Sequence, residues 1–282
     1  MTTLRSPVSL PQLINDLHQW PAWPSHLHDI LAALNNEDLD ASDLAKKIAC
    51  EQTILAKLLR VANSPFYGVT GHVSNALQAI NIIGLRNTRS IVIAAAVMSK
   101  VPPETLPWFD LSAFWKGGIT VASAAQWLAG KLSVSASDAF TAGMLHNIGQ
   151  VILAYKFPTQ YAEIWSPETI SELELIQHER AQFGFDHAEV GAALARQWHF
   201  PESLVESLRW HHDPDQSQSK NARILWAADQ ISSITAQQEK LKSTELRAAI
   251  DAVLTQLMHE KNDCEALLEN MRQQVAAFGA LV

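Results

Sequence analysis

The sequence contains little that points to secretion or to a membrane. Only two cysteines are present, Cys50 and Cys264, and they stand far apart with no Cys-x-x-Cys pairing. Free thiols in a reducing compartment are the plain interpretation. No run of roughly 18 apolar residues is available to span a bilayer, and the first residues lack the basic-then-apolar order of a signal peptide. We therefore expect a cytoplasmic protein that has no membrane partner.

Positive charge is also scarce. The 282 residues include 21 Lys and Arg against 29 Asp and Glu, which gives a formal net charge of −8. Binding to nucleic acid without regard to base sequence needs clustered Lys and Arg side chains that displace counterions. Anionic membrane surfaces also attract clusters of Lys and Arg. Neither partner is expected here. With 48% hydrophobic residues, the chain can bury a substantial core, as one large or two medium domains.

Strand patterns, internal repeats and low-complexity segments are lacking as well, and the periodicity is helical nearly throughout. Leu55, Leu58, Leu59 and Ala62 have the i, i+3, i+4, i+7 spacing of one apolar helical face. Further helices are predicted at residues 88–101, 112–132, 138–147, 166–183 and 222–233, with two more after residue 243. The predicted fold class is all-α. Three prolines in residues 101–110 mark a domain boundary, so the predicted divisions are 1–101, 102–235 and a C-terminal extension, 236–282.

One helix start is marked with particular clarity. Asp186 and Glu189 have the spacing of a capping box, in which each side chain satisfies a backbone N–H of the first helical turn. His187 is therefore predicted to lie in the first turn of a helix. A histidine pair, His211-His212, follows at the predicted end of the next helix.

Two blocks of the sequence together resemble the HDOD family, helical bacterial regulatory domains related to the HD phosphohydrolases. The first block is LRVANSPFYG (residues 59–68) followed by ALQAINIIGL (76–85). The second is Phe114-Trp115, AGMLHNIG (142–149), FDHAEVG (185–191) and WHH (210–212). The resemblance covers residues 7–235. It implies a two-lobed helical bundle whose C-terminal lobe is similar to the HD phosphohydrolase core.

The resemblance also implies a set of metal ligands, because HD enzymes bind metal through several histidines, a His-Asp pair and a late aspartate. The residues that match this pattern are His146, His187, His211 or His212, and Asp229. Imidazole and carboxylate suit borderline metals, which polarise a phosphoryl oxygen and activate water. Two positions depart from the pattern. Gly117 lies where the first histidine belongs, and Asn147 replaces the bridging aspartate.

These departures argue against a two-metal enzyme, because a neutral amide cannot hold two cations against their mutual repulsion. Two alternatives are open: a single ion such as Fe, Zn or Ni, or a relic site that holds no cofactor. A relic site should still bring its former ligands together around one small polar cavity, with Asn147 bonded to a histidine. The ligands expected there are His146, His187, His211 and Asp229.

The resemblance favours a non-catalytic signalling or scaffold module that binds partner proteins. The rival is a metal-dependent phosphohydrolase acting on nucleotides or cyclic dinucleotides. No kinase, receiver, GGDEF-like or Walker-type motif accompanies the domain. The expected partners are signalling proteins, and a homodimer is compatible with the sequence. Residues 63–68 form either a recognition loop or a turn whose aromatic rings pack into the core.

Overall fold

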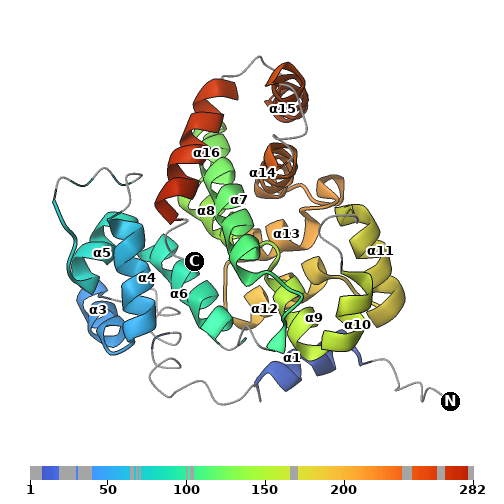
Figure 1. Cartoon of the computed structure of the whole chain (residues 1–282), viewed down its shortest axis with the longest axis horizontal. Coiled ribbons are helices and arrows are strands. Elements are labelled where there is room, and N and C mark those ends of the chain that lie inside the picture. The colour runs from blue at the N-terminus through green and yellow to red at the C-terminus, as the bar shows by residue number, and fades with distance from the viewer. Residues whose placement is uncertain are drawn as a thin grey trace.

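The computed structural model describes residues 8–18, 30, 40–63, 67, 69, 71–99, 101, 105–165, 171–236, 243–258 and 264–278. Within these residues the chain forms helices and turns and no strand (Figure 1), which confirms the all-α prediction. The first helices are α1 (Leu10–His18), α3 (Ala41–Ala49), α4 (Gln52–Ala62), α5 (Ala76–Ile83) and α6 (Leu85–Ser99).

The rest of the chain supplies the helices that surround the candidate site, followed by a C-terminal pair. The first set is α7 (Leu111–Lys131), α8 (Ala136–Leu145), α9 (Ile148–Lys156), α10 (Pro158–Ile164), α11 (Glu172–Phe183), α12 (His187–Gln197), α13 (Glu202–Trp210) and α14 (Lys220–Ala236). The C-terminal pair is α15 (Ser243–Met258) and α16 (Cys264–Phe278). No helix in the described ranges combines the length and apolar character needed to cross a membrane.

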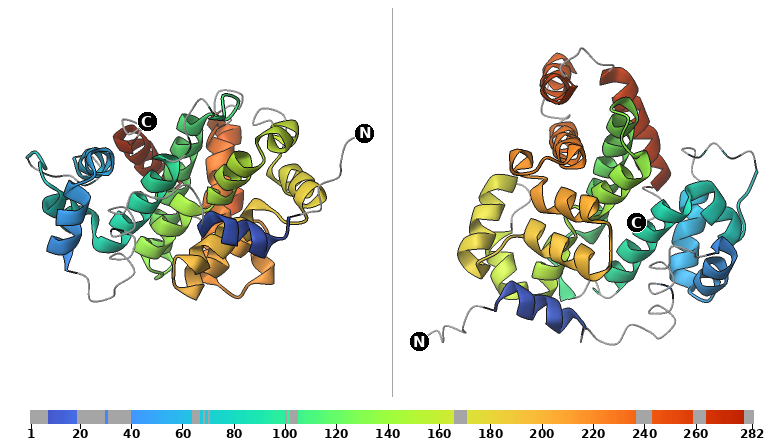
Figure 2. Two further views of the ribbon diagram at one scale, coloured as in Figure 1. Left: turned by 90° about the horizontal axis from the view of Figure 1, so that it is seen from below. Right: turned by 180° about the vertical axis from the view of Figure 1, so that it is seen from behind.

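Helices α7 and α8 pack along each other at the centre, and α14 packs against both (Figures 1 and 2). Helix α12 packs between α13 and α9, and α6 joins the group formed by α3, α4 and α5 to α8. One cluster of buried apolar side chains extends from Leu13 to Met271. This shared core does not mark a boundary, so the divisions expected after residues 101 and 235 stay predictions. Pro102 and Pro103 lie outside the described residues.

Two glycines set the close helix contacts on which the site depends. A Cβ on Gly143 of α8 would lie 2.4 Å from Ala122 Cα of α7. A Cβ on Gly149 of α9 would lie 2.0 Å from the His187 carbonyl oxygen of α12. Real Cβ atoms do not approach so closely, so only glycine lets the helix backbones meet. Gly143 and Gly149 flank His146 in the sequence, and Gly149 contacts the backbone of His187, so these close approaches fix the positions of both histidines in the bundle.

The helix starts were predicted with mixed success. The capping box of Asp186 with Glu189 is present in both directions, and His187 is the first residue of α12. The helix that ends at Phe183 begins at Glu172, where Ser171 is the N-cap in its own capping box. The start predicted at residues 166–167 was therefore wrong for this helix, and those two residues lie outside the described ranges.

The C-terminal pair packs on the rest of the bundle. Helix α15 lies against α14, and α16 lies against α7 and α4. The apolar stripe of α15 faces inward, with Leu246, Ile250 and Leu254 buried.

Candidate functional site

The residues that the sequence singled out come together from four helices. His146 directly follows α8, His187 begins α12, His211 and His212 follow α13, and Asp229 lies within α14. His146 Nε2 is 3.5 Å from Asp229 Oδ1. The ring centroid of His211 lies 5.5 Å from that of His146, 5.9 Å from that of His187 and 3.8 Å from that of His212. The predicted cluster is therefore present.

The three buried histidines share one orientation. Each places its Nδ1 against an oxygen: His146 on the Gly143 carbonyl at 2.8 Å and His211 on the Leu208 carbonyl at 2.7 Å. In His187 the Nδ1 partner is a carboxylate oxygen at 2.7 Å. An Nδ1–H that donates to an oxygen fixes the tautomer and leaves the Nε2 lone pair available as a ligand. The Nε2 atom of His211 is buried and has no hydrogen-bond partner among the described residues.

The carboxylate that orients His187 is Glu179 of α11, which sequence reasoning missed. Its side chain is completely buried. Glu179 Oε2 accepts hydrogen bonds from the backbone N–H and from Nδ1 of His187, at 2.9 and 2.7 Å, and Oε1 accepts one from the Tyr161 hydroxyl at 2.6 Å. A buried carboxylate that orients an imidazole is the usual outer support of a metal-binding histidine.

Burial and neighbouring charge divide the histidines into charged and neutral members. Burial lowers the pKa of His187, but the surrounding carboxylates, Glu179 foremost, outweigh it and raise the pKa to about 9. Burial lowers the pKa of His211 to about 3, with repulsion from neighbouring imidazoles acting in the same direction. The pKa of His212 is also held well below its usual value by burial and by His211. A charged His187 therefore donates from Nε2 to the Nε2 of neutral His212, 2.9 Å away.

A second carboxylate that the sequence did not reveal, Glu172, lies at the open side of the cluster. Glu172 Oε1 is 3.8 Å from His187 Nε2 and 3.9 Å from His212 Nε2. Burial raises the pKa of Glu172, and the negative charge of Asp229 raises it further. Burial alone would raise the pKa of Asp229 too, but the hydrogen bond with His146 and the attraction of the neighbouring imidazoles together outweigh burial and lower it.

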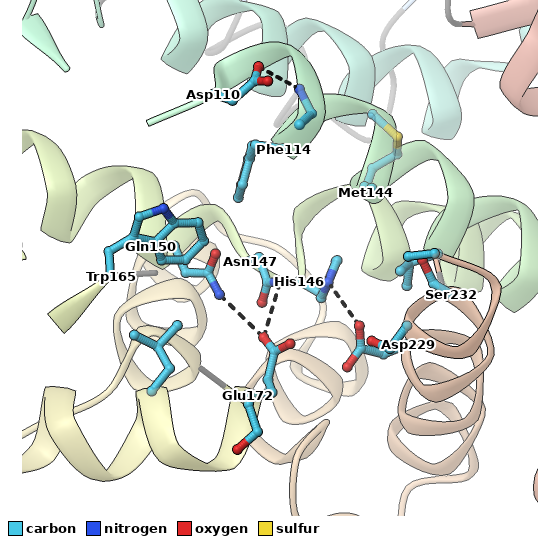
Figure 3. A pocket seen from close by; sticks show the side chains of 18 of the residues that line it. Asp110, Phe114, Met144, His146, Asn147, Gln150, Trp165, Glu172, Asp229 and Ser232 are labelled. Atoms are coloured by element: carbon cyan, nitrogen blue, oxygen red, sulfur yellow. Dashed lines mark hydrogen bonds and ion pairs between the residues drawn. The ribbon is translucent and has the colours of Figure 1, made fainter. Parts of the chain in front are cut away.

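Asn147 does not act as predicted. We expected it to hold a histidine, but its Nδ2 atom donates to Glu172 Oε1 at 3.4 Å, beside Gln150, whose Nε2 donates to the same oxygen at 3.3 Å (Figure 3). Glu172, the first residue of α11, thus takes the place as partner of this amide that we had expected a histidine to hold. The Oδ1 atom of Asn147 is buried without a hydrogen-bond partner in the described chain.

The donor set fits a single metal ion. Potential ligand atoms of His187, His211 and His212 lie within 4.8 Å of one another, and so do those of Glu172, His212 and Asp229. His211, whose buried Nε2 has no hydrogen-bond partner in the described part of the chain, belongs to the first group. Imidazole nitrogens with one or two carboxylates suit Zn, Fe or Ni. A metal at the first group would take the place of the proton between His187 and His212.

A cavity of about 330 Å³ opens beside this cluster (Figure 3). His146 and Asp229 line it, as expected, whereas His187 and His211 are not among its lining residues. The prediction of one cavity surrounded by all four was therefore wrong; Glu172 and Asn147 line the cavity in their place. Gly117, at which the resemblance implies the first histidine, lines the same cavity as His146 and Asp229.

Comparison with known proteins agrees with the resemblance seen in the sequence. A family model described as HDOD domain matches residues 20–214. An uncharacterized protein of Treponema pallidum (strain Nichols) is 26% identical over 219 residues, which make up 75% of this chain and 40% of that protein. The match thus spans less than half the length of this curated relative.

Solved structures cover the chain almost completely. A candidate phosphohydrolase from Shewanella amazonensis SB2B has a TM-score of 0.76 and 28% identity, over 98% of both chains. An HDOD domain protein of unknown function from Geobacter sulfurreducens has a TM-score of 0.63 and 21% identity, over 96% of both chains. At that identity the second similarity shows the fold alone.

Proposed function

The chain belongs to the HDOD domain family, and from that premise we propose that it is a non-catalytic signalling module that binds partner proteins through its helical surface. The observation that carries this proposal is the pair Gly117 and Asn147. Gly117 lines the same cavity as His146 and Asp229, which supports the proposal that an HD centre here lacks its first ligand. Asn147, which replaces the bridging aspartate, donates a hydrogen bond from its amide to Glu172.

Hydrolysis of a phosphoester at an HD centre needs a metal-activated water and a clamp on the phosphoryl oxygens. With a neutral amide at position 147, two cations would repel each other without a bridging charge between them. The remaining donors support one ion at most, and we propose that a single Fe, Zn or Ni ion has a structural role among the inner histidines. His187, His211 and His212 would hold it, with Glu172 or Asp229 as the carboxylate.

The second candidate is a metal-dependent phosphohydrolase acting on nucleotides or cyclic dinucleotides. Two observations favour it: the shared orientation of the three buried imidazoles and the similarity to the Shewanella candidate phosphohydrolase. A phosphatase and phosphodiesterase screen with Mn, Ni and Mg separates the two functions. We expect turnover no higher than that of the His146→Ala, Asp229→Ala double variant. Turnover well above that control, for any phosphoester, would establish the enzyme instead.

The proposed binding of partner proteins is tested by a separate experiment. Signalling proteins are the proposed partners, and the protein is proposed to act in the cytoplasm. Affinity capture with the tagged full chain in its native cell, followed by a binding titration with each purified candidate, tests this. A signalling protein that binds the purified chain stoichiometrically would support the module. If none of the captured signalling proteins binds directly, the proposal fails.

A further inference from the structure

The cavity beside the histidine cluster has two chemically different sides. Aromatic rings of Phe114 and Trp165 lie on one side, and carboxylates of Glu172 and Asp229 lie at the other (Figure 3), while Trp108 adds a third aromatic residue to the lining. Asp110 adds a third carboxylate to the lining. Among the described residues no lysine or arginine lines this space. Aromatic faces and carboxylates both attract cations, and an anion would find no charged partner here except a histidine.

The hydrogen-bond acceptors at the floor of the cavity are not fully satisfied by the described residues. Asn147 Oδ1 is buried and accepts no hydrogen bond within the described part of the chain. From the described residues Glu172 receives two long bonds, from the amides of Asn147 and Gln150, at 3.4 and 3.3 Å. A buried acceptor without a donor costs roughly 1–3 kcal/mol. A ligand that brings N–H donors would satisfy Asn147 Oδ1 and shorten the contacts of Glu172.

Gly117 leaves space for a ligand at the wall of the cavity. A Cβ built on Gly117 meets no atom within 4 Å, so this wall of the cavity is open where an HD enzyme carries a metal-binding imidazole. A residue without a side chain at this position offers no ligand and leaves more room in the cavity. The volume of about 330 Å³ lies in the range of small-molecule sites.

We propose that this cavity binds a compact organic cation, with an amidinium, guanidinium or ammonium group at Glu172, Asn147 and Asp229 and a flat apolar body between Trp165 and Phe114. The donors of the cation pair with the acceptors at the floor, and its charge offsets the repulsion between the two carboxylates. Its apolar body removes aromatic surface from water. This inference goes beyond the proposed function and stands independently of it, since it needs neither catalysis nor a protein partner.

The proposal is tested with three ligands that are similar in shape but differ in charge: benzamidine (a cation), benzamide (neutral) and benzoate (an anion). Each is titrated into the full chain by calorimetry in buffer that contains a chelator, so that no metal competes for Glu172. Benzamidine should bind at least about tenfold more tightly than benzamide, a difference of about 1.4 kcal/mol. Benzoate should bind more weakly than either. Equal affinities, tighter benzoate or no binding of benzamidine would each overturn the proposal.

Two variants locate the binding. Gly117→Leu fills the open wall and should abolish binding of benzamidine. Gly130→Leu is its matched control, because Gly130 lies on the same helix, is exposed and also has no atom within 4 Å of an added Cβ. Glu172→Gln keeps the shape and removes the charge, so benzamidine should lose about tenfold in affinity while benzamide is unchanged.

The matched control for Glu172→Gln is Glu163→Gln, at an exposed position on α10. Wild-type affinity in folded Gly117→Leu, or in Glu172→Gln, would show that the molecule binds elsewhere and would overturn the proposal. If Gly117→Leu fails to fold, the Glu172→Gln comparison still decides. The phosphoester screen is a separate measurement, so failure here leaves the proposed function standing and the converse also holds.

Discussion

Replacing Glu179 by glutamine should destabilise the protein strongly at neutral pH and hardly at all at pH 9. In the folded state Glu179 is completely buried and accepts from His187 Nδ1 at 2.7 Å. Its charge is the main reason why the pKa of His187 rises, against the effect of burial, to about 9 from an ordinary value of 6.5. Glutamine keeps the size and one acceptor oxygen but removes that charge.

The magnitude follows from the difference between the folded and unfolded pKa values of His187. A raised pKa means that the folded protein keeps a proton that the unfolded chain loses, so the stabilisation is fully present below pH 6.5 and is lost as the pH rises through 9. The step from 6.5 to about 9 corresponds to about 3 kcal/mol, at roughly 1.4 kcal/mol per pKa unit. Near pH 9 less than about 0.5 kcal/mol is left.

Urea unfolding at pH 6.5 and at pH 9, with a chelator present, measures the effect. Glu179→Gln should lower the free energy of unfolding by about 3 kcal/mol at pH 6.5 and should flatten the decline that the wild type shows between the two pH values. Glu163→Gln, on the exposed face of α10, should behave like the wild type at both. An equal loss at pH 6.5 and pH 9 would refute the reasoning, since it would mean that Glu179 acts through packing and not through the charge on His187.

Three further outcomes are expected. Tyr161→Phe removes the 2.6 Å hydrogen bond to the buried carboxylate and should cost about 2 kcal/mol of unfolding free energy; a loss below about 0.5 kcal/mol would contradict it. Gly143→Ala forces a Cβ into the α7 backbone and should lower the stability by about 3 kcal/mol, read from the same unfolding curves. Asn147→Asp together with Gly117→His should raise the calorimetric affinity for Mn or Fe; no gain in a folded double variant would show that the histidines are ordinary core residues.

Local signals made part of the site predictable. The capping box of Asp186 with Glu189 fixes the start of α12, so the position of His187 followed from a few neighbouring residues. The all-α class followed from the apolar spacing in the same way. Helices α9 and α10 were missed, and the burial of α9 explains why. Its residues from Ile148 to Ala154 are buried on every side, so no polar face remains to give the sequence a helical period.

The two carboxylates of α11 were not predictable from local pattern. Glu179 acts on His187 across a helix boundary, and Glu172 meets Asn147, 25 positions earlier in the chain. Both glutamates lie in a helix whose exposed positions also carry Glu, Gln and His. Residue type alone therefore does not distinguish these two glutamates from the exposed ones. Only the packing of α11 against its neighbours decides which glutamates turn inward. Long-range contacts of this kind have no signature in spacing, whereas capping residues do.

The position of α16 has a consequence for how the chain folds as it is made. Residues 264–278 lie against both α7 and α4, elements that leave the ribosome long before them. Until α16 has emerged, the apolar side chains of α4 and α7 that it covers are exposed to water and to other nascent chains. Such surfaces are where aggregation begins and where chaperones bind. Helix α16 therefore completes the packing of α4 and α7 late, and the group formed by α3, α4 and α5 gains this contact only after residue 278 has been made.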